Sequence, residues 1–177
     1  VEGNVREFDV GKFNERYFNY VAAFGAMCDV PFTTRRESKE ALGNIAYILE
    51  GISKLPEIKS HEITYSIGNR EYKKNILFGL IYSGNRVAGM ELEDKKKSSI
   101  DDGHFNVLIV DYVPTIFNTP DILSTLVQYK RFIHRYHTDR ISLSFDKDLV
   151  WTLDGEAVDK VDHADISITN KALKILA

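Results

Sequence analysis

A tight-turn signal between two strand-like runs is the feature that most constrains this fold. The runs His61–Ile67 and Arg70–Tyr82 are rich in aromatic and β-branched residues, and Gly68-Asn69 lies between them. A two-residue loop that contains glycine is typical of a β-hairpin, because glycine readily adopts the positive φ angle that such turns require. The sequence therefore predicts antiparallel β-structure around residues 61–82.

Similar strand-like runs, separated by turn signals, recur along most of the chain. Phe105–Val113 is nearly continuous valine, leucine, isoleucine and tyrosine, which predicts a central strand. The other predicted strands are Arg6–Val10, Tyr17–Phe24, Arg140–Phe145, Leu149–Leu153, Glu156–Val161 and Ala164–Thr169. Many short strands with turns between them favour a β-sandwich or a two-sheet barrel.

Two helices are expected at the edge of this β-structure. Ser38–Leu55 places its apolar residues close to the helical period, and Ser38 is a suitable N-cap. Pro120–Arg135 begins with a proline and carries a second apolar stripe. This placement puts a basic cluster near the end of the second helix, made of Arg131, His134, Arg135 and His137. Cations are favourable at a helix C-terminus, so this position competes with phosphate binding as an explanation of the cluster.

Length and charge limit the classes of function. The chain has 177 residues and a formal net charge of -3, without the basic surplus that nucleic-acid-binding domains usually show. No run approaches the roughly 20 apolar residues that a membrane span needs. We therefore expect residues 1–177 to form one mainly β domain of a cytoplasmic protein with no nucleic-acid partner. Because the chain begins with Val1 and already has a strand-like pattern there, we expect it to be an excised domain.

Two acidic turns carry the candidate chemistry. In Leu153-Asp154-Gly155-Glu156, the Asp-Gly pair predicts a hairpin turn, and Glu156 would project from the rim of the sheet. In Ile100-Asp101-Asp102-Gly103-His104-Phe105, consecutive acids precede glycine, and oxygen ligands of this kind suit Mg²⁺. The alternatives are a purely structural hairpin turn in the first case and a solubilising loop in the second.

A third motif, Leu42-Gly43-Asn44-Ile45-Ala46-Tyr47, precedes both acidic turns. Gly43 and Ala46 would form a small-residue notch on a helix, against which another element can pack closely. The three motifs, in this order, resemble the C-terminal domain of the diacylglycerol kinase and sphingosine kinase-like lipid kinases, most closely the soluble bacterial branch. The segment Met90–Ser99 departs from this pattern, because it lacks the Pro-x-Ala step that is common there.

The resemblance implies specific roles for four residues. Glu156 would be the general base that removes the proton from the lipid hydroxyl. A structural Mg²⁺ would be held by the side chain of Asp102 and by the backbone carbonyls of Ser99 and His104. Asp154, in contrast, is assigned mainly to its turn on the Asp-Gly pattern itself.

The resemblance also implies the partners. ATP would be the phosphoryl donor and would bind mainly to an N-terminal nucleotide-binding domain, since this chain contains no glycine-rich phosphate loop. Diacylglycerol or a related lipid alcohol would be the acceptor, presented at a membrane surface with which the protein associates peripherally. A homodimer is one assembly that we consider. Two alternatives from other classes stay open: a non-catalytic β-sandwich that binds a lipid or a protein partner, and a metal-assisted hydrolase that pairs Asp102 with Glu156.

Overall fold

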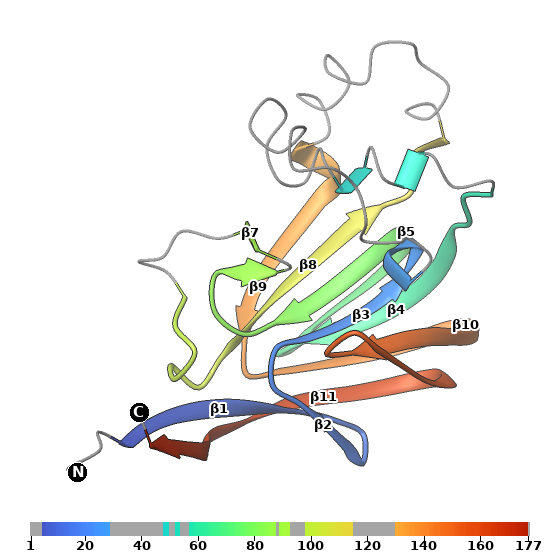
Figure 1. The fold of residues 1–177 in the computed structure, drawn as a ribbon. Coiled ribbons are helices and arrows are strands. Elements are labelled where there is room, and N and C mark those ends of the chain that lie inside the picture. The colour runs from blue at the N-terminus through green and yellow to red at the C-terminus, as the bar shows by residue number, and fades with distance from the viewer. Residues whose placement is uncertain are drawn as a thin grey trace.

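A computed structural model describes residues 5–28, 48–49, 52–53, 57–87, 89–92, 98–114 and 130–176. Within these ranges the chain is almost entirely β-structure (Figure 1). The main strands are β1 (Val5–Phe13), β2 (Arg16–Phe18), β3 (Val21–Gly25), β4 (His61–Ile67), β5 (Arg70–Tyr82), β8 (Phe105–Asp111), β9 (Ile133–Thr138), β10 (Arg140–Leu153) and β11 (Glu156–Leu176). The short strands β6 (Arg86–Val87) and β7 (Met90–Glu91) form a separate ribbon, and two 3₁₀ turns, Ala26–Cys28 and Lys130–Phe132, complete the described elements.

The main sheet closes on itself through β5 and β10, because β3 and β4 each pair with both of them. The strand order is β2-β1-β11-β10-β3-β5-β8-β9, and β4 pairs with both β10 and β5. One half of β10 pairs with β4 and the other half with β3, and β5 pairs with the same two strands in the same way. The register of β10 with β11 shifts between Ser144 and Leu149, which is where β10 passes from one partner to the other. The predicted class, a mainly β two-sheet barrel or sandwich, is therefore confirmed.

One apolar core fills the inside of this closed arrangement. Trp151 is at its centre, fully buried, with its ring centroid 4.8 Å from that of Phe13 and 4.4 Å from that of Phe24. Inward-facing residues of the surrounding strands complete the core, including Ile63, Tyr65, Ile109 and Leu143. Clustering of this kind is what the alternating strand patterns predict, because every second side chain of a strand faces the same side.

A second apolar cluster covers the outer face of β5 and β8. Leu77, Leu80 and Leu108 lie there against Ile48 and Ile52, which belong to the helical residues 48–49 and 52–53. Burial on both faces explains why these two strands read as continuous apolar runs rather than as alternating ones. The prediction of a central strand at 105–113 is therefore confirmed in position, although β8 ends at Asp111.

The helix predicted over Pro120–Arg135 is wrong at its C-terminal end. Lys130–Phe132 is a 3₁₀ turn, and Ile133–Arg135 belongs to strand β9, which pairs with β8. Residues 133–138 alternate between the two faces of the sheet, and pairing with a central strand outweighs a helical pattern that is based on propensity alone. The cations at 134, 135 and 137 are therefore strand residues, and the helix-dipole explanation for them does not hold.

The remaining sequence predictions have different outcomes. The predicted strand 6–10 lies within β1, whereas the predicted strand 17–24 is divided between β2 and β3. Predicted strands 61–67 and 70–82 are observed with those same bounds. The segments 140–145 and 149–153 form one strand, β10, and the segments 156–161 and 164–169 both lie in β11. Most of the helix Ser38–Leu55, the whole motif Leu42–Tyr47 and residues 115–129 lie outside the described residues. No helix in the described part of the chain has the length and apolar character that crossing a membrane requires.

Candidate functional site

The Asp154-Gly155 pair forms the tight turn between β10 and β11. The φ angles are +52° at Asp154 and +93° at Gly155, and Leu153 pairs with Glu156 across the turn. Positive φ at both central residues is the geometry of the turns that match the twist of a β-hairpin. The turn that the sequence predicted at this position is therefore confirmed.

Asp154 also fastens this turn to the start of a distant strand. Its carboxylate oxygens accept hydrogen bonds from the backbone N–H groups of Asn19 at 2.8 Å, Tyr20 at 2.9 Å and Val21 at 2.9 Å. The Asp154 N–H in return donates to the Val21 carbonyl at 2.7 Å. Charge-assisted bonds of this kind are stronger than neutral ones, so Asp154 holds the β10–β11 hairpin against the beginning of β3.

Glu156 is exposed at the rim of the barrel. Residues directly opposite each other in an antiparallel pair project to the same face, so Glu156 lies on the face of its buried partner Leu153, which belongs to the inner core. The carboxylate is therefore placed where the apolar interior of the barrel meets solvent. A reacting group on a bound apolar molecule could reach it there.

The Asp101-Asp102-Gly103 turn is built differently, because its central carboxylate bonds to its own loop. Asp102 Oδ2 accepts the N–H of Ser99 at 2.8 Å, and Asp102 Oδ1 accepts the N–H of His104 at 3.0 Å. A carboxylate has about four acceptor positions, so two hydrogen bonds leave acceptor capacity on both oxygens. Asp101 accepts a hydrogen bond from the Ser99 hydroxyl. The loop that the sequence predicted to hold Mg²⁺ thus presents one fixed, exposed carboxylate.

Asp9 anchors this acidic turn from behind, a role that the sequence did not predict. Asp9 is only 3% exposed, and its carboxylate accepts the N–H of Gly103 at 2.6 Å and the N–H of Lys171 at 2.7 Å. Its own N–H donates to the Ile100 carbonyl at 2.9 Å. These bonds join β1, β11 and the turn, and nothing in the alternating pattern of residues 6–10 distinguishes Asp9 from a surface residue.

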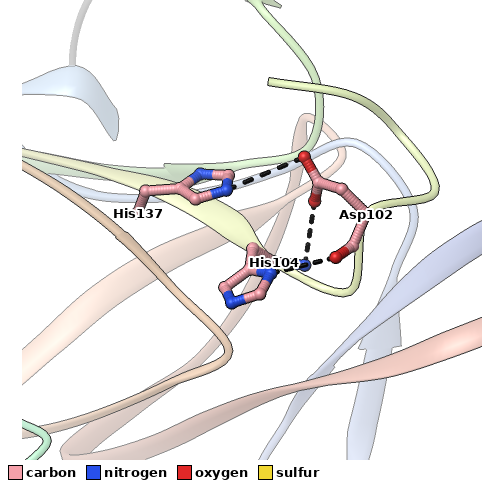
Figure 2. Close-up of side chains that lie close together, drawn as sticks. All are labelled: Asp102, His104 and His137. Atoms are coloured by element: carbon pink, nitrogen blue, oxygen red, sulfur yellow. Dashed lines mark hydrogen bonds and ion pairs between the residues drawn. The ribbon is translucent and has the colours of Figure 1, made fainter. Parts of the chain in front are cut away.

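Two histidines lie beside Asp102. His104 follows it in the same turn, and His137 comes from β9, where it pairs with Asn106 of β8. The His104 and His137 rings stack with centroids 4.8 Å apart and an interplanar angle of 15°, and His137 Nε2 is 3.7 Å from Asp102 Oδ2 (Figure 2). One potential ligand atom from each of the three residues lies within 4.8 Å of the other two. The sequence predicted His137 in a basic cluster near the end of a helix, and only the observed strand pairing brings it beside Asp102.

The two acidic turns lie at the same end of the sheet but on different strands. The register runs from Leu153 to Ala22, from Ala22 to Ile81 and from Ile81 to Val107. Three strand spacings of about 4.8 Å place β8 about 14 Å from β10 along the sheet. Each acidic turn lies next to one end of this row of paired residues. The distance between β8 and β10 therefore argues against a hydrolase in which Asp102 and Glu156 share one metal ion.

A second polar cluster, unforeseen from the sequence, occupies the inner face farther along β5, β8 and β9. Lys74 Nζ lies 3.2 Å from Asp111 Oδ2, and His134 Nε2 lies 2.9 Å from the same oxygen. The hydroxyls of Tyr65 and Tyr136 are 2.8 Å apart nearby, and burial holds the pKa of each tyrosine above its ordinary value. A raised tyrosine pKa keeps the neutral form, so this cluster is a hydrogen-bonded part of the core rather than a source of strong bases.

Comparison with known proteins identifies relatives in sequence and in fold. No protein-family model matches the chain. A diacylglycerol kinase of Staphylococcus saprophyticus is 29% identical over 165 residues, which covers 88% of this chain and 52% of that protein. A diacylglycerol kinase of Staphylococcus haemolyticus is 32% identical over 113 residues, covering 63% of this chain and 33% of that protein. The chain thus spans about half the length, or less, of these curated relatives.

Solved structures share the fold over nearly the whole chain. A diacylglycerol kinase from Bacillus anthracis strain Sterne superposes with a TM-score of 0.64 at 17% identity, covering 98% of this chain and 56% of that chain. An NAD kinase from Archaeoglobus fulgidus, solved in complex with ATP, superposes with a TM-score of 0.52 at 10% identity, covering 98% of this chain and 55% of that chain. The superpositions show that the chain shares the fold of these kinases. The sequence matches confirm the resemblance to diacylglycerol kinases that the motifs indicated.

Proposed function

We propose that this chain is the C-terminal half of an ATP-dependent lipid kinase, in which it supplies the general base and a structural Mg²⁺ site. The acceptor would be diacylglycerol or a related lipid alcohol. The observation that carries the proposal is the position of Glu156, which is exposed at the rim of the barrel on the face of the inner apolar core. The sequence relatives named diacylglycerol kinase support the same reaction class.

In the proposed reaction, Glu156 takes the proton from the lipid hydroxyl as the hydroxyl oxygen attacks the γ-phosphorus of ATP. The O–P bond to the lipid forms, the bond to the bridging oxygen of ADP breaks, and the proton passes to the Glu156 carboxylate. Phosphoryl transfer requires mainly positioning and charge neutralisation, with one carboxylate to orient or deprotonate the nucleophile. Asp154 contributes by fixing the hairpin that carries Glu156 through its bonds to Asn19, Tyr20 and Val21.

The Mg²⁺ site would use Asp102 as its side-chain ligand, with the backbone carbonyls of Ser99 and His104. The donor set fits a hard cation, because the Asp102 carboxylate is exposed, held by two backbone N–H groups and retains acceptor capacity. When bound, the ion would supply fixed positive charge at the end of the sheet that also carries Glu156. Asp9, which holds the Gly103 N–H, would position this turn from within the core.

Nucleotide binding would come from a separate N-terminal domain, and the lipid would enter between the two domains from a membrane surface. A homodimer would add a second copy of the chain to these partners. We expect the 177-residue chain alone to transfer no phosphate. Detectable transfer by this chain alone would contradict the proposed division of labour.

The test is ATP-dependent phosphorylation of diacylglycerol by the whole protein that contains this chain, with Glu156→Gln beside the wild type. Glu71→Gln is a matched control, because Glu71 is an exposed glutamate just past the Gly68-Asn69 hairpin turn. We expect Glu156→Gln to lose activity and Glu71→Gln to retain it. Equal activity in the Glu156→Gln protein would exclude Glu156 as the base, and wild-type inactivity on a panel of lipid alcohols would favour a non-catalytic binding module.

A further inference from the structure

Asn106, which lies behind His137, determines which of the two His137 ring nitrogens carries the hydrogen. Asn106 is 4% exposed, and its amide nitrogen donates to the Gly84 carbonyl at 2.6 Å and to Ser98 Oγ at 2.6 Å. A carbonyl oxygen can only accept, so the amide nitrogen faces Gly84 and the amide oxygen faces His137. His137 Nδ1 lies 3.0 Å from that oxygen and must donate to it.

This tautomer directs a lone pair at a carboxylate. A neutral imidazole carries one N–H, so when Nδ1 donates, Nε2 is unprotonated. Nε2 of His137 lies 3.7 Å from Asp102 Oδ2 (Figure 2). Two electron-rich atoms that face each other repel unless a proton or a metal cation lies between them. Metal-binding histidines commonly show this arrangement, with the second ring nitrogen bonded to a buried oxygen acceptor.

The spacing of Asp102 and His137 suits a small transition-metal ion. Two ligands at about 2 Å from a tetrahedral Zn²⁺ lie roughly 3.3 Å apart, and the observed separation of 3.7 Å is close to that value. His104 is a candidate third ligand, but its ring must turn to reach the ion. Its ligand atom is placed only within 4.8 Å of the other two, and its ring stacks nearly parallel to that of His137. The Asp102 carboxylate is held in place by two backbone N–H groups, so this ligand is ordered before an ion binds.

We propose that Asp102, His104 and His137 form a binding site for a transition-metal cation of the Zn²⁺ class. Imidazole nitrogen suits Zn²⁺, Ni²⁺ and Cu²⁺, whereas Mg²⁺ selects oxygen ligands. The site therefore differs in ligand set from the proposed Mg²⁺ site, although the two share the Asp102 carboxylate. Occupation by Zn²⁺ would remove that carboxylate from Mg²⁺, so the two ions compete.

The two histidines contribute unequally. His137 presents its Nε2 lone pair to Asp102 with its Nδ1 already bonded to Asn106. His104 Nδ1, in contrast, donates its hydrogen to the backbone carbonyl of Asp102 at 2.9 Å. Metal binding by His104 therefore requires some rearrangement of its ring, so loss of His137 weakens binding more than loss of His104.

The test is titration of the chain with Zn²⁺ by calorimetry at pH 7.5 in a buffer that does not bind metals, with His137→Gln, His104→Gln and His163→Gln variants. His163 is a matched control, because it is an exposed histidine whose Nε2 lies 3.2 Å from the Asp165 carboxylate, remote in sequence from the proposed ligands. We expect one saturable Zn²⁺ per chain, affinity lowered more than tenfold by His137→Gln and by a smaller factor by His104→Gln, and a change below twofold for His163→Gln.

Several results would overturn the proposal. These are the absence of saturable Zn²⁺ binding, or affinities in the His137→Gln and His104→Gln proteins that equal the wild type. Since both side chains are exposed, the variants are expected to fold, and fluorescence of the buried Trp151 checks this. Titration with Mg²⁺ separates this proposal from the proposed function, because His137→Gln removes a Zn²⁺ ligand and leaves every oxygen ligand of Mg²⁺ in place.

Discussion

The two acidic turns look alike in sequence, yet their aspartates bond to different parts of the chain. Asp154 directs its carboxylate outward from its hairpin, to three N–H groups more than a hundred positions earlier in the chain. Asp102 directs its carboxylate inward, to the N–H groups of Ser99 and His104 in its own loop. The first aspartate joins two parts of the fold, whereas the second shapes one loop and keeps acceptor capacity for a ligand.

This difference indicates which residues of each turn are structural and which are candidates for catalysis or metal binding. At the β10–β11 turn, Asp154 is structural and the candidate reactive group is its neighbour Glu156. At the other turn, the aspartate itself is the candidate ligand, and its anchoring is left to the buried Asp9. An aspartate before glycine can therefore be a structural residue or a candidate ligand, and its hydrogen-bond partners indicate which of these roles applies.

The largest expected effect is on catalysis by Glu156→Gln in the whole protein. A positioned general base contributes about 10²–10⁴-fold to the rate, so we expect kcat for lipid phosphorylation to fall by about that factor. The free energy of unfolding should change by less than about 0.5 kcal/mol, because Glu156 is exposed. Steady-state kinetics and thermal unfolding measure the two quantities. If Glu156→Gln lowered the free energy of unfolding substantially as well as kcat, Glu156 would be structural, like Asp154.

The next effect is on stability, through Asp154→Ala. Hydrogen bonds to a charged group contribute about 1.5–3 kcal/mol each, and partial exposure and non-additivity reduce their sum, so we expect a loss of about 3 kcal/mol. Asp154→Asn should lose only about 1 kcal/mol, because asparagine tolerates positive φ and keeps one acceptor oxygen. Denaturant unfolding measures both variants. A loss below 0.5 kcal/mol for Asp154→Ala would remove the distinction between the two turns.

Local features of this fold could be read from the sequence, and long-range ones could not. The hairpin 61–82 was predicted with its observed bounds, because its turn and both its strands are contiguous in the chain. Strand β9 was missed because Ile133–Thr138 becomes a strand only by pairing with β8. The candidate site follows the same rule. Glu156 and Asp102 were proposed from turn motifs, whereas His137 reaches Asp102 only through that pairing, and Asp9 reaches Gly103 only through the folded core.

The glycines of the two acidic turns also differ in their surroundings. Gly103 and Gly155 have φ angles of +77° and +93°, so alanine is strained at both positions, at about 1–2 kcal/mol. An added Cβ at Gly155 meets nothing within 4 Å, whereas one at Gly103 would lie 2.9 Å from Nδ2 of Asn170. We therefore expect Gly103→Ala to be the more destabilising by several tenths of a kcal/mol. Denaturant unfolding of both variants checks the order, and the reverse order would mean that the Asp102 loop is the more adaptable turn.

The smallest effects of single substitutions are expected at the two neighbouring aspartates of the acidic loop. Asp102→Ala removes the acceptor of two backbone N–H groups and should lower the free energy of unfolding by about 1 kcal/mol. Asp101→Ala loses only the bond from the Ser99 hydroxyl, at an exposed position, and should change it by less than about 0.5 kcal/mol. Thermal unfolding with and without Mg²⁺ then tests the assignment of the ligand. Any increase in Tm on adding Mg²⁺ should persist in Asp101→Ala and vanish in Asp102→Ala, because only Asp102 is a proposed ligand. If the increase instead vanished with Asp101, the side-chain ligand would be the first aspartate of the pair, and Asp102 would be as purely structural as Asp154.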